Sequence, residues 1–311
     1  MTSALRSNQQ YVTKQSAFTL VELLVAITII GLLIALLVPA LQAARNSARR
    51  AQCANNLKGI GLALQSFHAA KGSFPSGYVS GVDPSGNETG PGWGWLSLSL
   101  TYMDQSPLAG MIDFRQPIES SANDVARTRL IANLLCPANE ISKPTWPTEV
   151  RDSTGEPVSL ICRVAFCAYV GMYGSTDTTP LGDGIFFRNS RIRVRDVTDG
   201  TSRTIAAGER AYVLGDGTWV GAVSGASMFP DDYSAKIAVE HLKPASAMVL
   251  GHVGLGNGPN SPSSELNQFY GLHGNGVNFV FADGHVVFLA STIDYPLYQS
   301  MATRAGGEGL H

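Results

Sequence analysis

Residues 17–44 read AFTLVELLVAITIIGLLIALLVPALQAA, and this stretch decides how the chain is organised. Over residues 18–44 the only charged side chain is Glu22. A helix of that length, at about 1.5 Å per residue, is roughly 40 Å long and exceeds the ~30 Å hydrocarbon core of a bilayer. The stretch therefore predicts a membrane-spanning helix over 18–44, preceded by a short basic leader, 1–17.

The single acid in this helix does not prevent insertion into a membrane. Residues 18–38 include fifteen Leu, Ile, Phe or Val side chains, which favour insertion by roughly 5–9 kcal/mol. A carboxylate costs about 2.5–3.5 kcal/mol at mid-membrane and less near the interface. Glu22 is thus tolerated and marks a functional position that needs a partner. A cut before Phe18 would create an α-amino group one helical turn away, in the same chain or in a neighbour.

The stretch KQSA-FTLVELL, with the long apolar helix after it, resembles the N-terminus of type IV pilins and type II secretion pseudopilins. The resemblance implies that a prepilin peptidase cuts between Ala17 and Phe18 and that Phe18 is then N-methylated. It also implies that Glu22 pairs with the amine of an adjacent subunit during assembly, and that Pro39 bends or loosens the helix. Ala17 stands where the family usually has glycine. An uncleaved signal anchor is the alternative.

The charges that flank the helix conflict with this resemblance on orientation. Four basic residues follow the helix over 45–58, against two in the leader, and a positive-inside count would keep the C-terminal part in the cytoplasm. The resemblance implies the reverse. We follow the resemblance and predict a single-pass protein of the cytoplasmic membrane, with residues 45–311 as a periplasmic or cell-surface head domain.

The predicted fold class is α+β, with the N-terminal helix as a pilin-like spine packed on an antiparallel, loop-rich β head. Over 45–71 the helix continues, because apolar residues recur at spacings of four and three, and Gly72 ends it. This apolar stripe consists of Cys53, Leu57, Ile60, Leu64 and Phe67.

The head reads as short strands between turn-rich loops. Asp283-Gly284 lies between two alternating runs in VNFVFADGHVVFL and predicts a β-hairpin. A short helix closed by Gly306 is expected in the tail. Further expected strands are 160–170, 184–188, 203–208, 217–223 and 246–251, an expected helix is 123–133, and expected loops are 81–92, 139–158, 225–235 and 253–267.

A second resemblance covers almost the whole chain. His273, nine residues and then Asp283-Gly284 match the H-x9-DG signature of domain-of-unknown-function family 1559, a large family of prepilin-like bacterial proteins. The stretches RRAQCANNLKGIGLAL, GWGWLSLSLTYMDQ, LLCPA and DGIFFRNSRIRVRDVTDGTSRTIAAGE also look like that family. The family is defined without an assigned activity, so the resemblance implies no chemistry.

Four cysteines are present, and an exported head would meet an oxidising compartment. Cys53 and Cys136 both fall in stretches shared with the family, so the resemblance favours a Cys53–Cys136 disulfide. Cys162 and Cys167 are five residues apart and face opposite sides of a regular strand. We expect them to be buried free thiols.

Several function classes find little support. The formal charge of −2 gives no basic face for nucleic acid. There is no G-x-S-x-G elbow and no CxxC, and the histidines lack ligand spacing, so we expect neither catalysis nor a metal site. The side chains considered for such a site are His241, His252, His273, His285, Glu209, Glu240 and Asp283. For Asp283 a turn role is the simpler interpretation. For His273 it is a hydrogen bond that ties its loop to the hairpin.

Two binding functions remain as weaker alternatives. Calcium is a conceivable cofactor of the oxygen-rich segments 196–204 and 82–90, although turn chemistry explains them equally well. Trp93 and Trp95 are suited to a glycan platform, although alternate residues of a strand are more often core.

The sequence thus predicts a prepilin-processed, membrane-anchored envelope protein. Its predicted partners are a prepilin peptidase, other pilin-like subunits or itself, and the membrane. The main alternative is a non-assembling anchored protein whose head binds a solute or a glycan.

Overall fold

The computed structural model describes residues 19–139, 144–176, 181–230, 242–254 and 256–307. The chain separates into two compact units, residues 1–47 and 48–311. The predicted leader and the bond between Ala17 and Phe18 lie outside the described residues, so the predicted cleavage stays a prediction.

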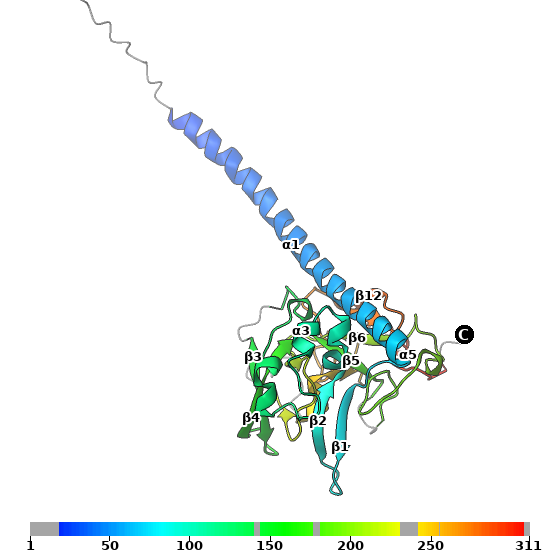
Figure 1. Cartoon of the computed structure of the whole chain (residues 1–311). Helices are drawn as coiled ribbons and strands as arrows, with labels where there is room; N and C mark the ends of the chain where they lie inside the picture. Colours follow the sequence, from blue (N-terminus) through cyan, green and yellow to red (C-terminus); the bar gives the residue numbers. More distant parts are fainter. Residues whose placement is uncertain (1–18, 140–143, 177–180, 231–241, 255, 308–311) are drawn as a thin grey trace, which may run out of the picture. The chain divides into compact units, whose positions relative to one another are not determined.

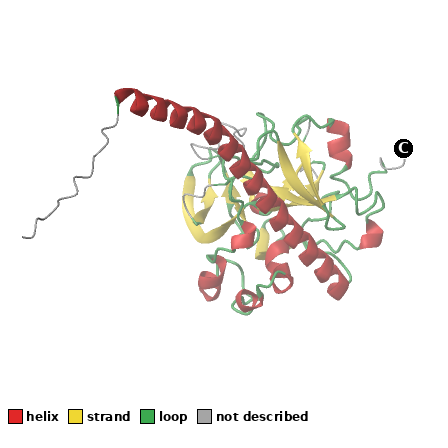
Figure 2. Cartoon of the chain, turned by 90° about the horizontal axis from the view of Figure 1, so that it is seen from above, coloured by secondary structure: helices red, strands yellow, loops and turns green. Residues whose placement is uncertain are grey.

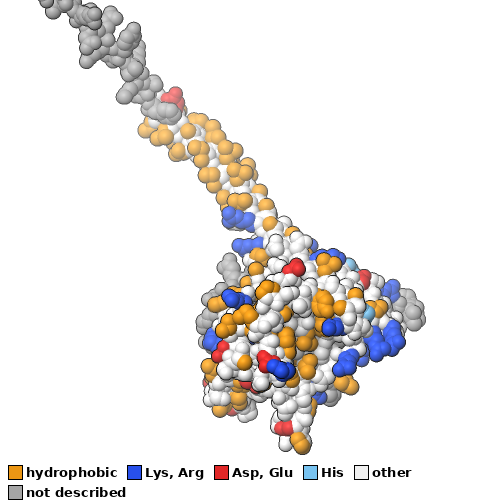
Figure 3. Space-filling model, viewed as in Figure 1, with side chains coloured by type: hydrophobic (Ala, Val, Ile, Leu, Met, Phe, Trp, Pro, Cys, Tyr) orange, Lys and Arg blue, Asp and Glu red, His pale blue; other side chains and the backbone are white. Residues whose placement is uncertain are grey.

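Helix α1, Leu20–Lys71, contains 52 residues and begins close to where the apolar run begins. Within the described residues it is the one helix long and apolar enough to cross a membrane, with a mean hydropathy of 2.9 over its most apolar window and none of that window buried. Figure 3 shows apolar side chains along the visible face of the helix before the first basic ones. Pro39 lies inside the helix, and because proline has no N–H the carbonyl of Ala35 loses its helical partner.

The later part of α1 belongs to the second unit and carries the predicted apolar stripe. Cys53, Leu57, Ile60 and Leu64 are each at most 2% exposed, while Phe67 is half-buried. The helix is followed by Gly72 with φ of +77°, a left-handed conformation that glycine adopts without a steric cost. The predicted spine and its end are therefore confirmed.

A five-stranded sheet holds the elements that later form the site. Its strand order is β10-β5-β6-β11-β12. The pairs are antiparallel except β10 with β5, which is parallel and differs from the predicted antiparallel arrangement. Figure 1 shows this sheet beside the later part of α1. The strands are β5 (Tyr169–Gly174), β6 (Ile205–Glu209), β10 (Leu250–His252), β11 (Gly276–Phe281) and β12 (Val286–Ala290).

Alternation along β11 divides the apolar residues between the two faces of this sheet. Val280 joins the core cluster that includes the stripe of α1. Phe279 and Phe281 belong to a second core cluster with Tyr298 of α5, Tyr295–Ser300. The predicted hairpin is confirmed, with Val280 opposite Val286.

A second five-stranded sheet and a hairpin complete the described head, and Figure 2 draws the strands as separate yellow groups. The second sheet has the order β7-β4-β3-β8-β9, with β3 (Thr145–Arg151), β4 (Pro157–Cys167), β7 (Gly217–Thr218), β8 (Ser227–Met228) and β9 (Lys243–Pro244). The hairpin joins β1 (Tyr78–Val82) to β2 (Glu88–Gly94). Short helices follow: α2 (Trp95–Ser99), α3 (Ser106–Ala109) and α4 (Asp124–Arg127), with 3-10 turns at Leu100–Tyr102, Ser121–Asn123, Ala132–Leu134, Val194–Asp196 and Ala245–Met248.

The helix predicted over 123–133 is wrong in length. Only Asp124–Arg127 is α-helical. Asn123 does not cap it, because its side chain instead accepts a hydrogen bond from the backbone N–H of Asp113 at 3.0 Å and donates to the carbonyl of Pro117. The tail helix is also shorter than predicted and ends at Ser300, well before Gly306.

Two predicted loops contain strands. Within 81–92 only the tip is a turn, and its flanks pair in the β1–β2 hairpin. The strand β3 lies within the predicted loop 139–158 and includes Pro147. Strand β8 pairs with β3 only at Glu149. At Pro147, β3 therefore has no hydrogen bonds to β8 that a missing N–H could break. The proline is tolerated in the strand at little energetic cost.

Three predicted strands are reduced or lost. The segment 184–188 is extended but irregular: Gly184 and Phe186 donate to carbonyls of β5, and only Arg188 forms an isolated bridge. The run 217–223 contains only the two-residue β7, and 246–251 is largely a 3-10 turn before β10. In these runs close tertiary packing replaces a regular ladder.

Candidate functional site

Glu22 lies in the first turn of α1 and closes a capping box with Thr19. The backbone N–H of Thr19 donates to Oε2 of Glu22 at 2.9 Å, and the Thr19 hydroxyl donates to the same oxygen at 2.7 Å. In return, the backbone N–H of Glu22 donates to the Thr19 hydroxyl at 3.2 Å. This T-x-x-E pattern is a helix-start signal that can be read in the sequence, although the prediction of the helix did not use it.

The capping box places the carboxylate of Glu22 against the backbone nitrogen of the residue that follows Phe18. A cut before Phe18 would create a free α-amino group on Phe18. That group would be one residue away from the Thr19 N–H that contacts Glu22. Phe18 itself lies outside the described residues, so its pairing with Glu22 stays a prediction.

The turn of the C-terminal hairpin is held by α1. Gly284 has φ of +87°, as the turn requires. Lys58 donates through Nζ to the carbonyl of Gly284 at 2.8 Å, and Gln65 donates to the carbonyl of Ala282. Gly61 has its backbone so near Gly284 that an added Cβ would lie 2.9 Å from the Gly284 Cα.

Asp283 acts within this turn and not on the buried residues. Its Oδ1 accepts the backbone N–H of His285 at 3.0 Å and lies 2.6 Å from His285 Nδ1. Partial burial works to raise the pKa of Asp283, but the hydrogen bonds from His285 outweigh it and hold that pKa below its ordinary value. The interpretation of Asp283 as a turn residue is confirmed.

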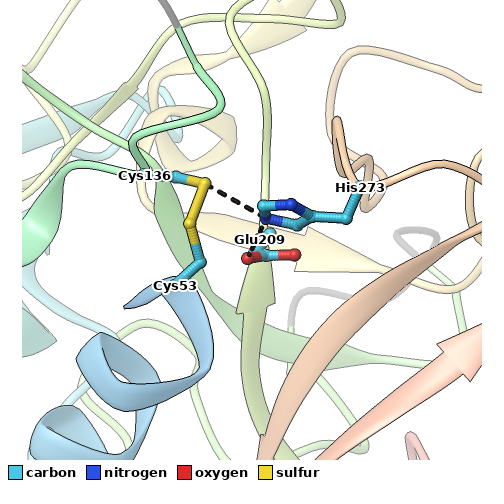
Figure 4. A group of neighbouring side chains, drawn as sticks. All are labelled: Cys53, Cys136, Glu209 and His273. Carbon is cyan, nitrogen blue, oxygen red and sulfur yellow. Dashed lines mark hydrogen bonds and ion pairs between the residues drawn. A yellow bond between two sulfur atoms is a disulfide. The ribbon is translucent and has the colours of Figure 1, made fainter. Parts of the chain in front are cut away.

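His273 lies in the loop before β11 and contacts different partners from Asp283. Its Nε2 is 3.1 Å from Oε1 of Glu209 and 3.2 Å from Sγ of Cys136. The side chains of His273 and Glu209 are each 2% exposed. Figure 4 shows the imidazole and the carboxylate together beside the disulfide. His273 and Asp283, the two ends of the sequence signature, thus belong to separate clusters.

Glu209 is the last residue of β6 and is saturated with donors. The backbone N–H of Asn278 in β11 donates to Oε2 at 2.9 Å, and its side-chain amide donates to Oε1 at 3.1 Å. A buried carboxylate is tolerated only when it is hydrogen-bonded in this way. His273 is thereby linked to β11 only through Glu209, so the predicted hydrogen bond from its loop to the hairpin has a different partner, the end of β6.

The Cys53–Cys136 disulfide is present, as the family resemblance implied. It joins α1 to the segment after the 3-10 turn Ala132–Leu134, with the two Cα atoms 5.2 Å apart. The hydroxyl of Tyr169 donates to the carbonyl of Cys53. Burial, and then the nearby carboxylate of Glu209, raises the pKa of Tyr169 well above its ordinary value, so the phenol stays a neutral donor.

Cys162 and Cys167 are buried free thiols, as predicted. Burial raises the pKa of both, and raises that of Cys167 to about 12. Neither thiol has the low pKa and exposure of a reactive cysteine.

No clustering of metal-ligating residue types was expected from the sequence, yet the fold brings four such residues together, two of them joined in the disulfide. One ligating atom from each of Cys53, Cys136, Glu209 and His273 lies within 4.8 Å of all the others. The four residues come from four distant segments: α1, the loop after Leu134, the end of β6 and the loop before β11. No local spacing connects them, so motif searching in the sequence had no signal to find.

The two segments considered for calcium, 82–90 and 196–204, each contain an aspartate whose carboxylate accepts hydrogen bonds from backbone N–H groups. Asp83 accepts the N–H groups of Ser85 and Asn87. Asp199 accepts those of Gly306 and Gly307. These contacts are the turn chemistry that the sequence analysis gave as the simpler explanation.

Trp93 and Trp95, considered above as a weaker alternative for glycan binding, are core residues, the more usual role of alternate strand residues. Trp93 and Trp95 are 1% and 0% exposed. The Trp95 indole donates to the carbonyl of Val249 and stacks on Phe186. A glycan platform on these two rings is therefore wrong.

Comparison with known proteins gives two family matches. A family model described as "Protein of unknown function (DUF1559)" matches residues 42–295. A second, described as "Prokaryotic N-terminal methylation motif", matches residues 12–38. No curated protein and no solved structure matches the chain. The motif and the apolar helix together indicate a pilin-like protein with a single-pass membrane anchor.

Proposed function

The chain belongs to the DUF1559 family of proteins of unknown function, and on that premise we propose that it is a prepilin-processed structural or secretion-associated subunit. A prepilin peptidase cuts between Ala17 and Phe18, and the apolar part of α1 then holds the protein in the cytoplasmic membrane. The head lies outside the cytoplasm. The proposal assigns no catalytic step and no cofactor to the head.

One observation carries this proposal: the methylation motif coincides with the start of the apolar helix, where Glu22 lies. The motif covers residues 12–38, and the helix begins at Leu20. An acid in a membrane span is costly and is retained where it has a partner. The amine of Phe18 in an adjacent subunit is the partner proposed here, and α1 is the assembly surface.

The test separates assembly from helix capping. Glu22→Ala removes both the carboxylate and the capping box, whereas Thr19→Ala disrupts the box but keeps the carboxylate. Mass spectrometry gives the mature N-terminus, and cross-linking in membranes measures association between pilin-like subunits. We expect a methylated Phe18 in the wild type and in both variants. We expect the cross-linked species to be lost only in Glu22→Ala. A Met1 start, or unchanged cross-linking of Glu22→Ala, contradicts the proposal.

A non-assembling solute-binding protein is the second candidate, and one cavity favours it. This cavity has a volume of about 280 Å³ and a polar lining of Ser175, Asp183, Gln299, Thr303, Arg304 and neighbouring residues. That volume falls just below the ~300–1,000 Å³ of typical small-molecule sites, so only a small solute would fit. Two results together would favour this candidate. Glu22→Ala would show unchanged cross-linking in membranes, and a solute would protect Arg304 from modification by a dicarbonyl reagent.

A further inference from the structure

The buried disulfide has two potential metal ligands beside it that a purely structural cross-link does not need. The Nε2 atom of His273 and Oε1 of Glu209 both approach the sulfur of Cys136, and all four ligating atoms of the cluster lie within 4.8 Å of one another. Figure 4 shows the imidazole and the carboxylate on one side of the S–S bond.

These distances are close to what a tetrahedral zinc site requires. Zinc binds thiolate at ~2.3 Å, imidazole at about 2.0–2.1 Å and carboxylate at about 2.0–2.2 Å, so neighbouring ligand atoms are roughly 3.3–3.8 Å apart. In the structure Nε2 of His273 lies 3.1 Å from the Glu209 oxygen and 3.2 Å from the Cys136 sulfur. All four ligand atoms lie within 4.8 Å of one another, so small side-chain shifts suffice to place them around one ion.

The surroundings orient these ligands. Asn278 binds both carboxylate oxygens of Glu209, and such outer hydrogen bonds fix the direction of a metal-ligating carboxylate. Cys53 is fixed on α1, and its side chain is fully buried. A small cavity of about 10 Å³ borders Cys136, Glu209 and Asn139, which is close to the space that one water molecule needs. It offers room for the small displacement.

The donor set indicates which metal fits. Two thiolates, one imidazole and one carboxylate form a mixed sulfur, nitrogen and oxygen set, which suits zinc and not calcium or magnesium. The two sulfurs are joined in a disulfide, and only free thiolates are strong zinc ligands. The two sulfurs therefore cannot bind zinc while the disulfide is intact.

We propose that Cys53, Cys136, His273 and Glu209 form a zinc site that opens when the disulfide is reduced. An external dithiol donates two electrons and two protons and becomes a disulfide, while the S–S bond breaks and leaves two thiols. Both thiols then lose their protons to solvent, the neutral imidazole of His273 keeps its single proton on Nδ1, and Zn²⁺ bonds to the two thiolates, to Nε2 and to the carboxylate of Glu209. This site is independent of the assembly function proposed above.

The test uses the full chain in detergent, with Zn²⁺ alone as the probe. One sample is oxidised and the other is reduced by a trialkylphosphine without denaturant, and mass spectrometry confirms the thiol state. After dialysis, we expect about one zinc per reduced chain, by elemental analysis, and less than a tenth of that per oxidised chain. Equal binding by both forms, or no binding by the reduced form, overturns the proposal.

Variants separate this site from adventitious thiol binding. His273→Ala and Glu209→Gln should each weaken zinc binding at least tenfold in a chelator competition. His285→Ala is the matched control, since His285 is 40% exposed and lies outside the cluster. It should bind zinc as wild type does, and so should the variant that lacks Cys162 and Cys167. Unchanged binding by His273→Ala contradicts the proposal.

Folding provides a second readout. Near-ultraviolet circular dichroism reports whether the reduced chain keeps its packed tryptophans. If reduction loosens the head, Zn²⁺ should restore the signal in wild type and not in His273→Ala. A loosened head that zinc does not restore, or a disulfide that resists the phosphine in the folded protein, also overturns the proposal.

Discussion

His273 places its Nε2 atom 3.1 Å from Oε1 of Glu209, and each of the two side chains is only 2% exposed. The pair links the loop before β11 to the end of β6, and Asn278 adds β11 to the same network. The loop before β11, the end of β6 and the strand β11 thus meet at the carboxylate of Glu209. Loss of that carboxylate leaves several buried donors without an acceptor.

Glu209→Ala should lower the free energy of unfolding by about 3 kcal/mol, because it breaks a buried pair and strands the donors of Asn278. Urea unfolding of the oxidised full chain in detergent measures this. His285→Ala removes a half-exposed histidine from its contact with Asp283 and should cost less than about 1 kcal/mol. Equal effects of the two variants would mean that the buried pair adds nothing beyond a surface contact.

Removal of the disulfide by Cys53→Ser with Cys136→Ser should lower the free energy of unfolding by about 4.5 kcal/mol on the chain-entropy model. The cross-link closes a long loop, with a sequence separation of 83 residues, and so restricts the unfolded chain strongly. Denaturant titration of wild type with and without reductant, in zinc-free buffer, is the control. It should reproduce the loss seen in the double variant, and a loss below 2 kcal/mol in both would contradict this prediction.

Two glycines on α1 should respond in opposite directions to alanine. A Cβ at Gly61 would lie 2.9 Å from the Cα and 3.0 Å from the carbonyl oxygen of Gly284, whereas a Cβ at Gly59 meets nothing within 4 Å. We expect Gly61→Ala to destabilise the fold by about 1–3 kcal/mol through overpacking. We expect Gly59→Ala to stabilise it by up to about 1 kcal/mol through helix propensity. Thermal unfolding compares them, and a shared sign would show that the contact with the hairpin turn is looser than described.

Cys162 and Cys167 should resist iodoacetamide at pH 8 in the folded protein and react in guanidinium chloride. The thiolate is the reactive form, and burial raises the pKa of Cys167 to about 12. Labelling followed by peptide mass spectrometry reads out both sites. Rapid labelling of the folded protein would show that the head opens locally.

The same raised pKa predicts a loss of stability at alkaline pH. The unfolded thiol of Cys167 ionises near its ordinary value of 9.0, while the folded thiol stays neutral until about pH 12. Its contribution is therefore complete below about pH 9 and is lost as the pH rises from there toward 12. Cys167→Ala should flatten the decline of unfolding free energy over that interval.

Patterns carried by neighbouring residues predicted much of the fold. The apolar run and the stripe through Leu57 and Ile60 predicted α1, and Asp283-Gly284 predicted the last hairpin. Each depends on the period of one element or on one turn. The T-x-x-E pattern of Thr19 and Glu22 was equally local and was missed, because the acid was considered only as a membrane residue.

The remaining features depend on tertiary contacts that no local pattern encodes. Asn123 resembles a helix cap, but its side chain binds the backbone of Asp113, and the helix after it is short. Pro147 resembles a loop residue, but it lies in a strand where its missing N–H needs no partner. The cluster around His273 joins four segments that only the completed fold brings together.

The hydrogen bond from Lys58 to the carbonyl of Gly284 joins residues that are 226 positions apart. At about 5–20 residues per second, a ribosome needs roughly 10–45 s to make the intervening chain. During that interval the apolar stripe of α1 has no hairpin to pack on and is available to any chaperone that binds nascent chains. The head can therefore close around its first helix only after translation has reached the last two strands.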